Sequence, residues 1–185
     1  MRLNLPVVNL RFPVVHDMKV GMIVKRDPQA ADQESVWDYP RPPVAVPCHK
    51  RLVIIHDGNT IADTHKAVRT LETSHPPTYY FPQADVLMSA LRPVDGSSFC
   101  EWKGHSRYLD VIVDGQVLPK VAWSYPTPTA DFAILRDHIA FYAQPFDSCL
   151  VGGERVTPQP GGFYGGWITS DLSGPFKGVP GSRFW

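Results

Sequence analysis

Three two-residue turns, each set between β-forming segments, constrain the fold of this chain more than any other feature. Glycine adopts positive φ without steric cost, so an Asp-Gly or Gly-Gly pair between such segments is typical of a tight β-hairpin. The pairs are Asp57-Gly58, Asp114-Gly115 and Gly152-Gly153, and they lie in segments 51–64, 108–123 and 148–156. The sequence therefore predicts three antiparallel hairpins and a mainly β protein.

Proline and glycine support the same fold class. The 19 prolines and 14 glycines leave few long stretches of helix-forming residues. Further strands are expected at residues 66–72, 78–81 and 139–142, which are rich in β-branched or aromatic side chains. One short helix is expected at 130–138, with Thr129 as its N-cap.

The length of 185 residues fits one domain with extensions. Residues 1–43 are interpreted as an N-terminal arm, because proline and polar residues interrupt their apolar residues. Residues 44–157 hold the hairpins and form the β domain. Residues 158–185 are rich in glycine, proline and aromatic residues, and we expect this tail to lie on the domain with its rings in surface grooves.

Charge excludes several kinds of partner. Lys and Arg number 18, as do Asp and Glu, and nucleic-acid or membrane-surface binders usually carry a basic excess. No apolar run approaches the roughly 20 residues that a membrane span needs. The first 21 residues lack the continuous apolar core of a signal peptide. We therefore expect a cytoplasmic protein without a nucleic-acid or membrane partner.

The three cysteines, Cys48, Cys100 and Cys149, are far apart in sequence. None forms a CxxC pair, which argues against a structural zinc site. We expect free thiols and no metal or other cofactor.

Two segments carry the candidate chemistry, residues 71–80 (LETSHPPTYY) and 99–125. In the first, Glu72 and His75 precede a rigid double-proline bend, which can hold them with little loss of entropy. In the second, a bend at Gly104 lets a ligand or backbone come close. We expect the two segments to face each other across one aromatic-walled pocket. Its expected residues are Glu72, His75, Tyr80, Cys100, Lys103, Tyr108, Trp123 and Tyr125.

Several sharper motifs are absent. The sequence has no glycine-rich phosphate loop, no nucleophile elbow and no dinucleotide fingerprint. A nucleotidyltransferase needs a Gly-Ser followed by two acidic residues one apart. Gly96-Ser97 is followed instead by Asp110 and Asp114, and Asp114 lies in a predicted turn. This spacing argues against metal-dependent phosphoryl transfer.

The motifs VRTLETSHPPTYYFP, CEWKGHSRYLDV, AWSYPTP and IAFY, in this order, resemble the domain-of-unknown-function family 427 over residues 51–156. The resemblance implies a β-tent fold, in which two antiparallel sheets are pinned at one edge, here without zinc. A nucleotidyltransferase-like label is sometimes attached to the family, which the missing acidic pair does not support. The positions that match the family pattern are Arg69, Glu72, Pro77, Tyr80, Cys100, Lys103, Gly104, Tyr108, Trp123 and Tyr125, and they add Arg69 to the ligand-binding candidates.

Three functions are compatible with these residues. The favoured hypothesis is binding of a small polar or planar molecule in the aromatic-lined pocket. The alternative is an enzyme with nucleotide-directed or thiol-directed chemistry, whose catalytic candidates are Glu72, Lys103, Cys100 and His75. If the Cys100 thiol is the nucleophile, His75 or His105 would be its base. The third is a homo-oligomeric interaction module built on the aromatic arm and tail.

Overall fold

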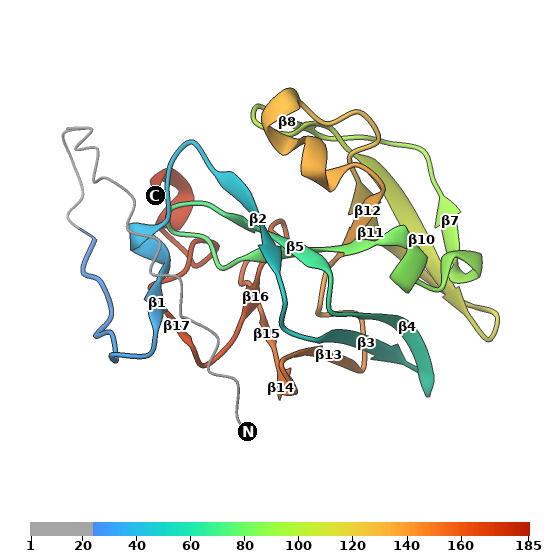
Figure 1. The fold of residues 1–185 in the computed structure, drawn as a ribbon, viewed down its shortest axis with the longest axis horizontal. Helices are drawn as coiled ribbons and strands as arrows, with labels where there is room; N and C mark the ends of the chain where they lie inside the picture. Colours follow the sequence, from blue (N-terminus) through green and yellow to red (C-terminus); the bar gives the residue numbers. More distant parts are fainter. Residues whose placement is uncertain (1–23) are drawn as a thin grey trace, which may run out of the picture.

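The structure is a computed structural model that describes residues 24–185, so the first 23 residues of the predicted arm lie outside the described residues. Two antiparallel sheets form its body (Figure 1). The larger sheet consists of β2 (Val44–Cys48), β5 (Ala67–Leu71), β6 (Thr78–Pro82), β12 (His138–Phe141), β11 (Gln116–Ser124), β10 (Arg107–Val113) and β7 (Leu91–Pro93), in that order. The smaller sheet consists of β14 (Glu154–Arg155), β13 (Ser148–Val151), β3 (Leu52–His56) and β4 (Asn59–Thr64). The prediction of a mainly β fold is confirmed.

The three predicted hairpins are β3–β4, β10–β11 and β13–β14. Both residues of each turn have positive φ, for example 48° at Asp57 and 71° at Gly58. This is the backbone conformation that two-residue hairpins with right-handed strand twist require. Three two-stranded pairs complete the sheets: β1 (Glu34–Ser35) with β17 (Leu172–Ser173), β8 (Phe99–Cys100) with β9 (Gly104–His105), and β15 (Thr157–Pro158) with β16 (Trp167–Ile168).

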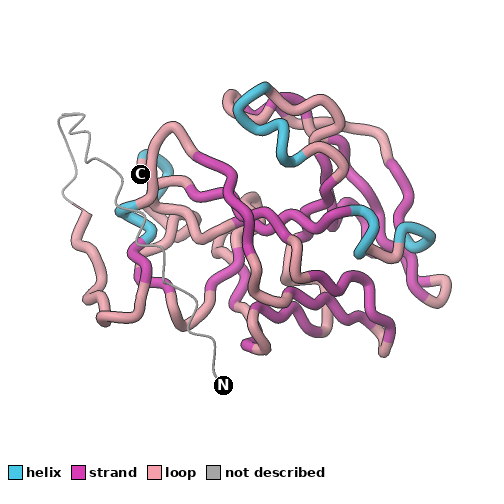
Figure 2. The backbone as a smooth tube through the Cα atoms, in the orientation of Figure 1, coloured by secondary structure: helices cyan, strands magenta, loops and turns pink. Residues whose placement is uncertain are grey.

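The helices of the described residues are short 3₁₀ turns, drawn in cyan in Figure 2. They are η1 (Val36–Asp38), η2 (Gln83–Asp85), η3 (Met88–Ala90), η4 (Ala130–Leu135) and η5 (Ser182–Phe184). The expected helix at 130–138 is η4, which ends earlier than predicted. It ends because Arg136 is extended and Asp137 has a φ of 60°, a combination that a helix does not contain. No helix among residues 24–185 has the length and apolar character needed to cross a membrane.

Strand alternation divides the apolar residues between two faces of the larger sheet. Tyr79 and Phe81 of β6 point into the core between the sheets, where they join Leu52 and Ile54 of the smaller sheet. Tyr80 points the other way, because successive strand residues face opposite sides. On this outer face Tyr80 belongs to a second apolar cluster. The cluster also contains Trp123 of β11, Tyr125, and Phe132 and Leu135 of η4.

The tail contributes a ring to the core rather than only to surface grooves. Trp167 of β16 is fully buried and packs against Tyr79 and Phe81 with ring centroids 5.6 and 5.8 Å apart. Its indole N–H donates to the carbonyl oxygen of Phe141 at 3.0 Å. The expectation of surface grooves was therefore wrong for this residue. The division of the chain at residues 43 and 157 stays a prediction.

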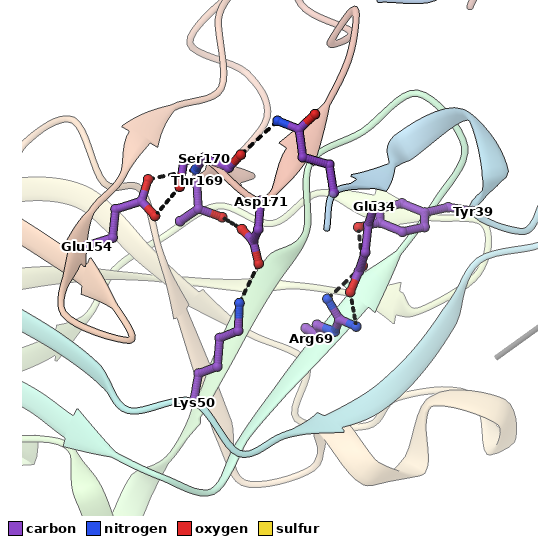
Figure 3. A network of polar contacts seen from close by, with 9 residues as sticks. Glu34, Tyr39, Lys50, Arg69, Glu154, Thr169, Ser170 and Asp171 are labelled. Atoms are coloured by element: carbon purple, nitrogen blue, oxygen red, sulfur yellow. Dashed lines mark hydrogen bonds and ion pairs between the residues drawn. The ribbon is translucent and has the colours of Figure 1, made fainter. Parts of the chain in front are cut away.

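A partly buried ion pair holds the described part of the arm against β5 (Figure 3). The Arg69 guanidinium donates to both carboxylate oxygens of Glu34, at 3.0 and 3.1 Å. The Tyr39 hydroxyl donates to the same carboxylate at 2.8 Å. Burial, followed by the charge of Glu34, raises the pKa of Tyr39, so its hydroxyl stays protonated and remains a donor.

A second polar group holds the tail (Figure 3). Asp171 forms an ion pair with Lys50 and accepts a hydrogen bond from the Thr169 hydroxyl. The Glu154 carboxylate accepts from the backbone N–H and the hydroxyl of Ser170, at 2.6 and 2.8 Å. The arm and the tail are thus fixed to the two sheets by charge-assisted hydrogen bonds, which are stronger than neutral ones.

Replacing Glu34 with glutamine tests the arm contact. We expect Glu34→Gln to lower the free energy of unfolding by about 2 kcal/mol, because the Arg69 side chain loses the charge of its partner. That side chain is only 20% exposed. Asp38→Asn is the matched control, since Asp38 and its partner Arg26 are mostly exposed. It should cost less than about 0.5 kcal/mol in urea unfolding. Equal costs for the two variants would contradict a role for the arm in stability.

Candidate functional site

A cavity of about 290 Å³ opens on the outer face of the larger sheet. Both predicted segments line it. Of the predicted ligand-binding residues, those lining it are Glu72, His75, Tyr80, Cys100, Lys103, Tyr108, Trp123 and Tyr125. The expected convergence of two distant segments on one hollow is therefore present in the structure.

The alternation of the strands explains why these side chains share a face. On β6, Thr78 and Tyr80 line the cavity, while Tyr79 between them is in the core. At the end of β11, Trp123 lines it, and Tyr125 does so two residues later. A period of two residues is what a strand produces.

Arg69 is the exception among the predicted residues. It lies on β5 one position before Thr70, which lines the cavity, so its side chain leaves from the opposite face of the strand. There it pairs with Glu34. Arg69 matches the family pattern, but its side chain forms the contact with the arm and does not line the cavity. Its place among the ligand-binding residues is therefore not supported.

A small loop positions Lys103 at the cavity. Gly104 turns the loop with a φ of 94°, a value that favours glycine. The Thr129 hydroxyl donates to the carbonyl oxygen of Trp102 at 2.5 Å, and the Thr129 N–H donates to that of Lys103 at 3.3 Å. The Lys103 ammonium lies 5.6 Å from the ring centroid of Phe132, within the range of a cation–π contact.

Hydrogen bonds determine which nitrogen of His75 carries the proton. The side-chain oxygen of Gln159 accepts from the Gly166 N–H at 3.1 Å, which fixes the orientation of the amide. The Gln159 NH₂ group then donates to the carbonyl oxygen of Lys177 at 2.9 Å and lies 3.1 Å from His75 Nδ1. Nδ1 must therefore accept, and the proton of the neutral ring is on Nε2. No group among residues 24–185 accepts a hydrogen bond from that Nε2–H.

Positive charge surrounds this histidine. The cavity is lined by the cations Arg41, Lys103 and Lys177 and by the carboxylates Glu72 and Glu101. Burial, followed by the charges of Lys177, Arg41 and Lys103, lowers the pKa of His75 to about 3. His75 is thus a neutral N–H donor at physiological pH.

Only part of this positive charge is compensated. The carboxylate of Glu72 lies 3.5 Å from the guanidinium of Arg41. Burial, then the charge of Arg41, lowers the pKa of Lys177, whose ammonium donates to the carbonyl oxygen of Trp185 at 2.7 Å. An anionic group in the cavity would therefore meet a favourable field.

The remaining walls are aromatic. The Tyr80 ring lies 6.4 Å from that of Trp123 and 6.3 Å from that of Tyr125, between centroids. Trp123 packs on Tyr142 at 4.7 Å. Burial raises the pKa of both Tyr80 and Tyr125, so their hydroxyls stay protonated. The walls offer flat apolar surface with a few hydroxyl groups.

The arm and the tail supply residues that sequence reasoning missed. Arg41 comes from the arm, and Gln159, Tyr164 and Lys177 come from the tail. Tyr164 packs on His75 with ring centroids 4.6 Å apart. A sequence signal existed for Tyr164, which lies in the unusual run GGFYGG at residues 161–166, where glycines flank an aromatic pair.

Cys100 has no base beside it. Its thiol is half-buried in the cavity wall and makes no hydrogen bond, with His75 or any other side chain, among residues 24–185. His105 lies instead against the Phe99 ring, with centroids 4.9 Å apart. The arrangement thus lacks the thiol–base contact of a cysteine nucleophile. Within the described part of the chain, no three His, Cys, Asp or Glu side chains are grouped so that they could hold a metal ion.

The state of His75 can be observed by nuclear magnetic resonance. With a pKa of about 3, its ring resonances should not titrate between about pH 5 and 8, the range in which ordinary histidines do. Its nitrogen shifts should indicate the Nε2–H tautomer. A midpoint near 6.5 for His75 would contradict the buried, positively surrounded environment.

Comparison with known proteins gives a match to one family model. The model is described as Domain of unknown function (DUF427), and it matches residues 44–152, more than half of the chain. Its short name carries a nucleotidyltransferase label, while its description assigns no activity. A search of curated proteins gives no match.

Proposed function

Because this chain belongs to the DUF427 family, whose description assigns no activity, we propose its function from the cavity itself: the protein binds a small planar ligand that carries a negative charge. The observation that carries the proposal is the meeting, in one cavity, of an unused N–H donor, an excess of cations and several aromatic walls.

The walls account for the planar shape. Aromatic side chains favour flat partners, because stacked and edge-to-face contacts between rings add to the free energy of area burial. Trp102, Tyr108 and Tyr142 are half-buried and can present such surfaces. At about 290 Å³, the cavity is at the lower end of the range of small-molecule sites, which suits a ligand of one or two rings.

The polar groups account for the charge. Lys103 and Arg41 can each contribute a charge-assisted hydrogen bond to a carboxylate or phosphate, and the neutral Nε2–H of His75 can donate a third. Glu72 is left as the acceptor for a ligand N–H. The proposal is limited to binding, because Cys100 has no adjacent base with which to perform nucleophilic chemistry.

Matched pairs of planar molecules test the proposal. Suitable pairs are uracil and orotate, adenosine and adenosine 5′-monophosphate, and 1-naphthalenesulfonamide and 1-naphthalenesulfonate. In calorimetric titrations we expect at least one anion to bind about tenfold or more tightly than its neutral partner, which corresponds to about 1.4 kcal/mol.

Two variants identify the site of any binding. Lys103→Gln should remove most of the advantage of the anion, whereas Lys66→Gln should leave it intact because Lys66 is exposed and does not line the cavity. If no anion binds more tightly than its neutral partner, or if the two variants behave alike, the proposed function is wrong.

A further inference from the structure

A second cavity adjoins the first. It has a volume of about 340 Å³ and shares five lining residues with the first cavity, so the two lie on either side of a common wall. The shared residues are Tyr108, Tyr142, Gln159, Tyr164 and Gly165. The second cavity was not predicted from the sequence.

The tail contributes Gln159, Tyr164 and Gly165 to this wall. The Tyr142 hydroxyl donates to the carbonyl oxygen of Phe163 at 3.2 Å, and the Gly166 N–H donates to Gln159. Phe163 itself is 70% exposed, and Gly162 has no atom within 4 Å of the place where a Cβ would lie. Tyr164 packs on His75 with ring centroids 4.6 Å apart, and Gly165 lies against the Trp123 indole, so the wall is held firmly on the side of the first cavity. A ligand that occupies both cavities therefore has to span this wall rather than displace it.

The second cavity differs in chemistry from the first. Three prolines, Pro119, Pro145 and Pro158, line it together with the tyrosines of the common wall. Gln144 and Lys120 are exposed at its edge. Proline and tyrosine faces are flat and apolar, and an amide at the edge can pair with the polar rim of a ring. These features suit a second ring more than a second anionic group.

We propose that the two cavities form one bipartite site. The ligand then has two parts: a planar anionic group in the cavity of His75, joined to a second ring that lies among the prolines of the adjoining cavity. This inference rests on the proposed function and extends it to the ligand as a whole. Taken together, the two volumes lie well within the roughly 300–1,000 Å³ of small-molecule sites, whereas the first alone is at the lower limit.

A pair of sulfonates provides the probe. 1-Naphthalenesulfonate is a planar anion, and 8-anilino-1-naphthalenesulfonate carries a separate phenyl ring in addition. We expect the anilino compound to bind at least about tenfold more tightly by calorimetry. Gln144→Trp should remove that gain by filling the second cavity, while leaving the affinity for 1-naphthalenesulfonate unchanged. Pro119→Trp is a second blocking variant for the same cavity, and Gln116→Trp, which adds the same ring to an exposed strand residue outside both cavities, is the control.

The outcomes separate this inference from the proposed function. Equal affinities of the two sulfonates for the wild type overturn the inference, as does a gain that persists in both blocked variants with unchanged melting temperatures. Binding of 1-naphthalenesulfonate that depends on Lys103 would still support the proposed function in that case. Failure of 1-naphthalenesulfonate to bind overturns the inference, and the other matched pairs then decide the proposed function alone.

Discussion

Replacing Trp167 with alanine should lower the free energy of unfolding by about 4 kcal/mol, the largest effect that we expect of any single change. Trp167 is fully buried between Tyr79 and Phe81, and its indole N–H donates to Phe141. Alanine would leave a cavity that the rigid strands around it cannot close. It would also leave the Phe141 carbonyl oxygen without that donor.

Urea unfolding of the variant measures this effect. Phe184→Ala is the matched control, because Phe184 is an aromatic residue of the same tail but is 83% exposed. It should change the free energy of unfolding by less than about 0.5 kcal/mol. Similar decreases in the free energy of unfolding for both variants would mean that burial of the Trp167 ring makes no special contribution to stability. A small loss for Trp167→Ala alone would mean that the indole is not a core residue.

Gly165→Ala should have the second largest effect, because it acts on stability and on the cavity together. A Cβ at this position would lie 2.1 Å from the Cη2 atom of Trp123. That indole is packed against Tyr142 at 4.7 Å and Tyr80 at 6.4 Å, so it has little room to retreat. Overpacking of this kind typically costs about 1–3 kcal/mol. We expect the tail segment 161–166 to move outward and ligand affinity to fall.

The control for Gly165→Ala lies three residues earlier. Gly162→Asn adds a larger side chain at a position with no atom within 4 Å, and asparagine tolerates its φ of 67°. It should change stability, and the affinity for an anion in the first cavity, far less than Gly165→Ala does, because Gly162 does not line that cavity. Comparison of thermal unfolding and calorimetric titration for the two variants separates a packing defect from a general sensitivity of the segment. Equal effects would contradict the close contact of Gly165 with Trp123.

Local signals account for the parts of the fold that were predicted from sequence. A hairpin such as β3–β4 depends on its own turn, Asp57-Gly58, and on the residues directly beside it. The two ends of the candidate site were predicted for a similar reason. Tyr80, Trp123 and Tyr125 alternate with core residues, so their common face could be derived from a period of two.

The parts that could not be predicted depend on contacts between distant residues. Gln159 contacts His75 and Lys177 lines the same cavity, and Trp167, between them in the chain, is anchored in the core. No periodicity within the tail indicates that anchor. Arg69 was predicted wrongly for a different reason. Its match to a family pattern does not indicate which face of β5 its side chain occupies. Its partner Glu34 is 35 residues away.

The rate at which Cys100 is alkylated by iodoacetamide tests the central claim most directly. Cys100 lines the cavity, whereas Cys48 and Cys149 are buried, and burial raises the pKa of Cys149 to about 12, so Cys100 should react first at about pH 8. A saturating concentration of the anion that binds best among the matched pairs should slow alkylation of Cys100 by about tenfold or more, while its neutral partner at the same concentration should not. An unchanged rate at a concentration that calorimetry shows to be saturating would mean that the ligand binds elsewhere.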